Sequence, residues 1–214
     1  MIGRNKNDTT EYFIDGRISI RKDLNQEKIA EHRSNLKFLI CVGLILILML
    51  AISLLNTFVF FSVQVKGQSM ENTLYTGDYL IANRVKDIER GSIVIIKGEN
   101  KTDDSWLIKR VIGLPGERVK IQGGYVYLSK DDGATWSKLN EPYLKKQGVT
   151  DTTQSDGKTE WIIGEEEYFY LGDNRENSSD SRYKYYDVCD REQIVGVVEN
   201  WSLSVANFFR AFKR

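Results

Sequence analysis

The stretch from Phe38 to Val65 contains no charged residue, and it limits what the rest of the chain can be. About 20 apolar residues are needed to cross the hydrocarbon core of a membrane, and this run is longer. A cleavable signal peptide has an apolar core of only about 7–15 residues followed by small residues. Here bulky residues continue to Phe61. We therefore predict an uncleaved transmembrane anchor helix at residues 38–58; a buried helix of a soluble domain is the alternative.

The charges on either side of this run predict its orientation. Six basic residues lie within about 20 residues before it, the range over which the positive-inside bias acts: Arg17, Arg21, Lys22, Lys28, Arg33 and Lys37. After it, Lys66 is the one close basic residue. We expect a single-pass protein of the cell membrane, with residues 1–37 cytoplasmic and the rest exocytoplasmic. Residues 18–37 could form a charged helix, and the part before them reads as a mobile tail.

Short runs rich in β-forming residues follow the anchor, and Gly, Asp and Asn separate them at hairpin-like intervals. They are Tyr79–Asn83, Ser92–Ile96, Trp106–Ile112, Arg118–Ile121, Tyr125–Leu128, Trp161–Ile163, Tyr168–Leu171 and Ile194–Glu199. This pattern predicts a mainly β fold, in which an antiparallel β domain at residues 59–200 follows the membrane helix. Residues 123–165 read as an insertion of cap-like hairpins away from the chemistry, because residues 131–157 are polar and rich in turn residues.

Residues 201–214 form an amphipathic segment. As a helix they place five apolar residues on one face: Trp201, Val205, Phe208, Phe209 and Phe212. Basic residues end the segment. Packing on the β domain and lying in the membrane interface are both open.

Charge and cysteine content exclude two classes of protein. The 214 residues carry 30 basic and 30 acidic side chains, so no basic field points to a nucleic-acid partner. Cys41 lies in the apolar run and Cys189 near the C-terminus, and no Cys/His cluster suggests a metal. We expect neither a metal nor an organic cofactor.

Histidine restricts the possible hydrolytic chemistry. His32 is the one histidine of the chain and falls on the other side of the predicted anchor from the β domain. A Ser-His-Asp triad or a Cys-His pair in that domain is therefore excluded. A general base there must be a carboxylate or a lysine.

Ser69 and Lys109 are the candidates for nucleophile and base. Ser69 follows the apolar run closely, although a Gly-Ser stretch is also common in ordinary turns. Lys109 lies within the apolar run Trp106–Ile112. If it points inward, its neighbours remove water and lower its pKa from about 10.4, as a lysine base requires. A lysine that points to solvent from an edge strand is the alternative.

Four blocks of the sequence, in order after an anchor, resemble the conserved boxes of bacterial type I signal peptidases. These proteins are membrane-bound serine endopeptidases of the peptidase S26 type with a Ser–Lys dyad. The blocks are residues 67–74 (GQSMENTL), Gly77-Asp78, residues 109–117 (KRVIGLPGE) and residues 172–182 (GDNRENSSDSR). The resemblance covers about residues 38–200. It implies a β fold shared with the repressor-type peptidases.

The resemblance also implies residue roles. Ser69 would be the nucleophile, with its backbone N–H as the oxyanion donor, and Lys109 the general base. Ser178 would orient the lysine amine. The remaining positions would support the site, as an ion pair (Asp180, Arg182) and as structural residues of the strand end and turn (Gly172, Asp173, Asn174).

Two positions depart from the family pattern. Asn72 stands where the nucleophile box usually has proline, which would fix φ near −65°. Gly67 stands where some members carry a hydroxyl residue as a further oxyanion donor. Loss of one such donor costs about 2.7–4 kcal/mol in other hydrolases, so we expect a replacement donor.

The function implied is removal of N-terminal signal peptides from exported preproteins after a small-x-small site. The substrate would add as an extended strand between residues 63–68 and 106–108. The residues assigned to substrate binding are Val65, Gln68, Trp106, Leu107 and Ile108. Partners would be secretory preproteins, membrane lipid and, as a further candidate, the protein translocase.

Three rivals stay open. A self-cleaving repressor-type Ser–Lys peptidase is soluble and carries a DNA-binding domain, which the apolar run opposes. A catalytically silent relative in a secretion pathway is opposed by the presence of Ser69, Lys109 and Ser178. A peptidase dedicated to one substrate, such as a pilin, cannot be ranked against a general one.

Overall fold

The computed structural model describes residues 8–98, 106–153 and 155–212, with side chains from Lys28 to Ala211 in those ranges. It divides into two compact units, Met1–Leu55 and Asn56–Arg214. Each unit is described by itself.

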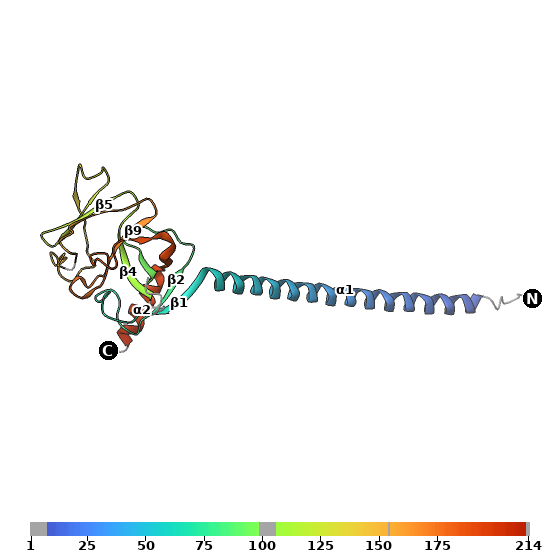
Figure 1. Cartoon of the computed structure of the whole chain (residues 1–214). Helices are drawn as coiled ribbons and strands as arrows, with labels where there is room; N and C mark the ends of the chain where they lie inside the picture. The colour runs from blue at the N-terminus through green and yellow to red at the C-terminus, as the bar shows by residue number, and fades with distance from the viewer. Residues whose placement is uncertain (1–7, 99–105, 154, 213–214) are drawn as a thin grey trace, which may run out of the picture. The chain divides into compact units, whose positions relative to one another are not determined.

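The first unit is helical. Helix α1 runs from Asp8 to Val59 and contains the predicted span 38–58 (Figure 1). The prediction of a mobile tail before residue 18 was wrong for residues 8–17, because they belong to the helix. Residues 1–7 lie outside the described part. Both prolines of the chain, Pro115 and Pro142, come later, so none interrupts this helix. Its segment Lys28–Val59 is long enough to cross a membrane and contains an 18-residue window with a mean hydropathy of 3.1.

The second unit is mainly β, as predicted. Its strands are β1 (Phe60–Gln64), β2 (Tyr79–Asn83), β3 (Ile93–Lys97), β4 (Trp106–Gly113), β5 (Arg118–Gln122), β6 (Tyr125–Ser129), β7 (Ser137–Lys138), β8 (Glu160–Ile162), β9 (Glu167–Leu171), β10 (Cys189–Asp190) and β11 (Ile194–Val198). Two short 3₁₀ turns, η1 (Arg175–Asn177) and η2 (Arg191–Gln193), interrupt the loops. The sequence did not predict β7 and β10, because a strand of two residues leaves no alternating pattern.

The strands form two antiparallel sheets. The seven-stranded sheet has the order β1-β2-β11-β3-β4-β9-β10, and the four-stranded sheet has the order β7-β6-β5-β8. Strand β11 therefore separates β2 from β3. A built Cβ on Gly113 of β4 would lie 2.2 Å from Ile163 Cδ1, so this glycine allows the two sheets to meet closely.

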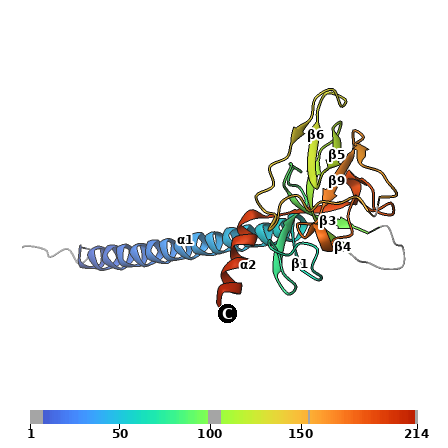
Figure 2. The ribbon, with the colours of Figure 1, turned by 90° about the vertical axis from the view of Figure 1, so that its left-hand side faces the viewer.

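The four-stranded sheet corresponds to the predicted insertion, but it begins with β5 at Arg118 rather than at residue 123. Val119 and Trp161 of this sheet pack with Phe169 of β9, so the core there is shared by the two sheets. Figure 2 shows β5 and β6 at one end of the domain and helix α2 at the other.

Helix α2 runs from Asn200 to Phe212. It packs on the β domain, which was one of the two open interpretations, but the face that packs is not the apolar face that the sequence predicted. Leu203 and Ala206 pack on the core beside β2. The predicted apolar face is exposed at Trp201, Val205, Phe208 and Phe209; the side chain of Phe212 lies outside the described part.

Candidate active site

Ser69 lies in a tight loop between β1 and β2. The backbone N–H groups of Thr73 and Leu74 both donate to the Met70 carbonyl, which gives the loop a helical turn just after Ser69. Met70 and Leu74 are buried in the core and fix that turn. Among the described residues the Ser69 N–H has no hydrogen-bond acceptor. This donor is therefore available to an incoming oxygen.

Lys109 lies on β4 and points inward, which is one of the two orientations that the sequence left open. Its side chain is 3% exposed and its Nζ lies 2.7 Å from Ser69 Oγ. Burial removes water from the ammonium group and lowers the Lys109 pKa to about 8. The Asp180 carboxylate opposes this shift and the Arg182 guanidinium adds to it. A substantial fraction of Lys109 is therefore neutral at mildly alkaline pH.

Asp180 and Arg182 form the predicted ion pair behind the site. Arg182 Nε donates to Asp180 Oδ1 at 2.8 Å, and both side chains are buried. Asp180 Oδ2 also accepts a hydrogen bond from the Gly172 N–H at 3.0 Å. The pair therefore fixes the end of β9 as well as the field around Lys109.

Asn174 connects the turn after β9 to the Ser69 loop. Its backbone N–H donates to the Ser69 carbonyl at 3.0 Å, and its side-chain amide donates to the Gln68 carbonyl at 3.1 Å. Asn177 reaches the Gln68 side chain at 2.9 Å. The Gln68 side chain, predicted to bind substrate, is thus already engaged within the protein.

Gly172 lies where a side chain cannot fit. A Cβ built on it would lie 2.2 Å from Ser178 Oγ and 2.4 Å from the Ser69 carbonyl oxygen. Ser178 is therefore beside the Ser69 backbone. Its hydroxyl oxygen is buried without any hydrogen-bond partner among the described residues. The hydrogen bond to the Lys109 amine that the resemblance implied is absent, since the amine is directed to Ser69 instead.

Asp173 is held by a residue that sequence reasoning did not single out. Arg110, next to Lys109 on β4, donates from Nε and Nη2 to the two Asp173 oxygens at 2.8 and 2.6 Å. Thr73 of the Ser69 loop also donates its hydroxyl proton to Asp173. Asp173 thus connects the lysine strand to the serine loop. The Lys-Arg pair in the sequence was the available signal.

Part of the insertion is attached to the site. Arg175, in the turn after Asn174, pairs with Glu141 and Thr150, and all three side chains are buried. Arg175 Nε also donates to the Gly172 carbonyl at 3.1 Å. The expectation that the whole insertion lies away from the chemistry was therefore wrong for residues 141–150.

The two departures from the family pattern both have positive φ. Asn72 has φ +88° and Gly67 has φ +87°. Proline cannot adopt the first value, and a residue with a Cβ is strained at the second. The loop conformation therefore suits the residues that the chain has, and it differs from the one a proline would impose.

The predicted substrate residues do not all face one groove. Val65 is in the core and both its backbone groups bond to the 77–78 turn. Leu107 and Ile108 pack on different core clusters, with Ile108 on the side of Val65 and Met70. Trp106 is 43% exposed, and its ring contacts Phe61 of β1 at 5.6 Å. Trp106 and Ile108 therefore remain candidates for the wall of a substrate groove. Leu107 is not a candidate, because its side chain packs on the other cluster.

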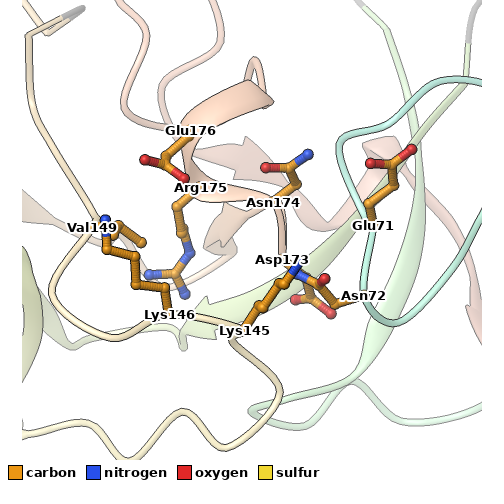
Figure 3. Close-up of a pocket in the computed structure, with 9 residues that line it drawn as sticks. All are labelled: Glu71, Asn72, Lys145, Lys146, Val149, Asp173, Asn174, Arg175 and Glu176. Atoms are coloured by element: carbon orange, nitrogen blue, oxygen red, sulfur yellow. The ribbon is translucent and has the colours of Figure 1, made fainter.

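A polar pocket of about 420 Å³ opens beside the Ser69 loop (Figure 3). It lies between three segments: Glu71 and Asn72 after Ser69, the turn 173–176, and residues 145–149 of the insertion. Lys145, Lys146 and Glu176 are exposed on its walls. The residues that the structure describes hold no cluster of three or more His, Cys, Asp or Glu side chains suited to a metal.

Comparisons with known proteins identify relatives. Residues 38–202 match the family model described as signal peptidase, peptidase S26. The chain is 33% identical over 178 residues to signal peptidase I P of Bacillus subtilis subsp. natto, covering 79% of this chain and 91% of the relative. It is 35% identical over 172 residues to signal peptidase I T of Bacillus subtilis strain 168, covering 75% and 83%. Signal peptidase IB of Staphylococcus aureus strain Mu50 is 35% identical over 151 residues, covering 63% and 73%.

Proposed function

This chain belongs to the signal peptidase family, peptidase S26, and we propose that it cleaves signal peptides from exported preproteins with Ser69 as nucleophile and Lys109 as base. The observation that carries the proposal is the 2.7 Å contact between Lys109 Nζ and Ser69 Oγ in a buried setting. A neutral Lys109 amine accepts the Ser69 proton through that contact. Its lowered pKa makes the neutral form accessible.

The chemistry then proceeds in two steps. Ser69 Oγ attacks the scissile carbonyl while Lys109 takes the proton, and the oxyanion accepts the Ser69 N–H. Lys109 returns the proton to the leaving amine, which leaves the signal peptide as an ester on Ser69. Lys109 next takes a proton from water, whose oxygen attacks the ester. Lys109 then returns this proton to Ser69 Oγ, which leaves as the free hydroxyl, and the signal peptide is released with a new carboxylate. Ser178 Oγ, buried and without a hydrogen-bond partner among the described residues, accepts a hydrogen bond from the Lys109 amine when Ser69 turns towards the substrate.

The signal-peptide side of the substrate adds as a strand between β1 and the first half of β4. The β9 pairing of β4 begins only at Arg110, so residues 106–108 have an unpaired edge. Along an antiparallel strand, successive residues direct their backbone N–H and C=O groups alternately to one side of the strand and to the other. Because Val65 bonds to the 77–78 turn, Gln64 and Lys66 present their backbone to the groove. Met70 and Ile108 pack in the core beside these strands, and we expect such bulky side chains to leave room only for small ones.

The mature side of the substrate lies towards the polar pocket. Along β4 the unpaired edge precedes Lys109, whereas Arg110 follows it and bonds to Asp173 on the pocket wall. The edge and the pocket therefore lie on opposite sides of the dyad. Charged walls favour polar residues after the cut.

The apolar helix anchors the enzyme beside its substrates, with the N-terminus cytoplasmic, as the flanking basic residues predict. Lipid contacts the span, and the translocase that delivers preproteins is a further partner. The contact between Ser69 and Lys109 counts against a silent relative.

The test is cleavage of a purified preprotein in detergent by the wild type, Ser69→Ala and Lys109→Ala. Lys130→Ala and Ser204→Ala are matched controls, because both side chains are exposed and remote from the dyad in sequence. We expect cutting after a small-x-small site by the wild type and both controls, and none by the dyad variants. Equal cleavage by all five proteins would exclude the mechanism. A wild type that cuts only one of a panel of preproteins would identify a dedicated peptidase.

A further inference from the structure

Arg110 is held by three hydrogen bonds around the edge of its guanidinium group. It follows Lys109 on β4, so its side chain points to the opposite face of the strand. Its Nε and Nη2 donate to the Asp173 carboxylate at 2.8 and 2.6 Å, and its Nη1 donates to the Gly91 carbonyl at 2.7 Å. A planar guanidinium donates only within its own plane, so these bonds leave its two flat faces uncovered.

Tyr143 of the insertion covers one of these faces. The centre of its ring lies 4.1 Å from Arg110 Cζ. A cation above an aromatic ring is attracted by the electrons of that face and is shielded from water. The Arg110 side chain is only 11% exposed as a result of all its contacts. The ring therefore stops the guanidinium from tilting away from Asp173 on that side.

Glu141 fixes the Tyr143 ring at its far end. The Tyr143 hydroxyl donates to Glu141 Oε1 at 2.7 Å. Burial raises the pKa of this hydroxyl, and the Glu141 carboxylate adds to the shift, so the hydroxyl remains a proton donor. Glu141 is itself buried and paired with Arg175. The ring above Arg110 thus has a fixed position and does not simply rest on the surface.

These contacts form a closed series on the turn after β9. Arg175, the partner of that glutamate, donates from Nε to the Gly172 carbonyl at 3.1 Å. Gly172 precedes Asp173, the residue that Arg110 holds. Within this series Tyr143 is the neutral side chain. Its replacement therefore leaves no buried charge without a partner, unlike the replacement of a charged member.

The same turn contacts the loop of the nucleophile. Thr73 of the Ser69 loop donates its hydroxyl proton to Asp173, and the Asn174 N–H donates to the Ser69 carbonyl at 3.0 Å. Asp173 thus connects the strand of Lys109 with the loop of Ser69. A misplacement of about 1 Å between reacting groups can cost roughly a hundredfold in rate. Whatever fixes Arg110 and Asp173 therefore bears on catalysis.

We propose that Tyr143 is a positioning residue, which acts through Arg110 and Asp173 on the geometry of the Ser–Lys dyad. The role rests on the proposed function of that dyad. The ring shields the guanidinium from water and holds it flat, so the Asp173 carboxylate stays where the Ser69 loop meets it. The insertion then supports the nucleophile in addition to forming one wall of the polar pocket.

The first test measures kcat and KM of the full chain in detergent, with a fluorogenic peptide that carries a small-x-small site. Tyr143→Leu removes the ring, whereas Tyr143→Phe removes only the hydroxyl. Tyr185→Leu, at a tyrosine that is 87% exposed, is the matched control. We expect Tyr143→Leu to lower kcat about tenfold with KM within about twofold, and Tyr143→Phe to keep at least about a third of kcat. The control should behave as the wild type. A phenylalanine variant as slow as the leucine variant, or a change in KM alone, would overturn the proposal.

The second test asks whether the effect passes through Arg110. Arg110→Lys keeps the charge but lacks the planar fork that the ring covers. Because residues that act together are not additive, Tyr143→Leu should lower kcat by less than about twofold in a chain that already carries Arg110→Lys. The same tenfold loss in both backgrounds would exclude this route.

Hydrogen–deuterium exchange requires no cleavage and separates this inference from the proposed function. The amides of Thr73, Leu74 and Asn174 are bonded within the site. We expect Tyr143→Leu to speed their exchange and to leave β2 and β3 as protected as in the wild type, with Tyr143→Phe unchanged. Equal acceleration across the whole domain, or none at these amides, would contradict the role. If the wild type cleaves no preprotein, the proposed function fails, while the exchange data still decide whether Tyr143 holds the Ser69 loop.

Discussion

Arg175 in the turn after β9 forms a buried ion pair with Glu141, 34 residues earlier in the insertion. The same guanidinium bonds to the Gly172 carbonyl, one residue before Asp173. The insertion is thereby attached to the segment that contacts the Ser69 carbonyl. Residues 145–149 of the insertion form one wall of the polar pocket as a result.

Glu141→Gln should reduce both stability and activity. Removal of one partner leaves the Arg175 charge buried and uncompensated, which costs about 3–5 kcal/mol. Urea unfolding followed by tryptophan fluorescence measures the change in the free energy of unfolding. Glu165→Gln, at an exposed glutamate, is the matched control. A Glu141 variant as stable as that control would show that the pair contributes nothing.

The pH dependence of cleavage should report Lys109. The base must be neutral, so kcat/KM should rise with pH through a midpoint near 8, where burial places the Lys109 pKa. Asp180 stabilises the ammonium form, so Asp180→Asn should lower this pKa and move the rise to lower pH. The unpaired Arg182 charge acts in the same direction. A fluorogenic peptide assayed from neutral to alkaline pH gives both profiles, and a shift to higher pH in the variant would contradict the assignment.

Asn72→Pro should impair the enzyme, although proline is the usual residue of the family. A φ of +88° is closed to proline, so the substitution forces the Ser69 loop to rearrange. We expect a loss of more than about 1 kcal/mol of stability together with lower kcat/KM. Asn72→Gly is the control, since glycine adopts positive φ readily. Full activity and stability of the proline variant would mean that the loop has the other conformation in solution.

Gly172→Ala should abolish cleavage. The new methyl group would overlap Ser178 Oγ and the Ser69 carbonyl oxygen. The Ser69 carbonyl is part of the backbone, so it cannot move aside without displacing the Ser69 side chain. Gly164→Ala is the control, because the methyl group added there would meet only the flexible end of the Glu167 side chain, which can move aside. Circular dichroism separates loss of folding from loss of activity. An active Gly172 variant would show that this close approach is not required.

Exchange of charge on the polar pocket should change the preference for residues after the cut. Lys145→Glu with Lys146→Glu makes every exposed charged side chain on its walls acidic. An exposed charge contact is worth about 0.2–1 kcal/mol, so the ratio of kcat/KM for basic over acidic residues at these positions should rise roughly threefold. A peptide pair that differs only there measures the ratio, and an unchanged ratio would place the mature side elsewhere.

Local pattern predicted the strands and the positions that carry chemistry. The β-forming run Tyr79–Asn83 predicted both ends of β2, and the apolar neighbours of Lys109 made its burial one of two open orientations. The contact with Ser69 followed only from the resemblance to a family, because the two residues are 40 positions apart.

Long-range and conformational details could not be predicted in the same way. Glu141 lies in a polar, turn-rich stretch, and nothing local distinguishes a carboxylate that finds Arg175 from one that faces water. The positive φ of Asn72 had a partial signal, since asparagine tolerates that region better than most residues. On α2 the sequence showed the apolar face but not that Leu203 and Ala206 supply the packing.

The position of β11 between β2 and β3 affects when the site can form during synthesis of the chain. Val197 and Val198 pair with β2, while Ile194 pairs with β3. The strand that follows Ser69 and the hairpin that carries Lys109 are therefore joined through the last strand of the domain. Because strands distant in sequence pair late, we expect Ser69 and Lys109 to meet only after nearly the whole polypeptide has been made. If the two residues act as we propose, a growing chain cannot cleave its neighbours before that point.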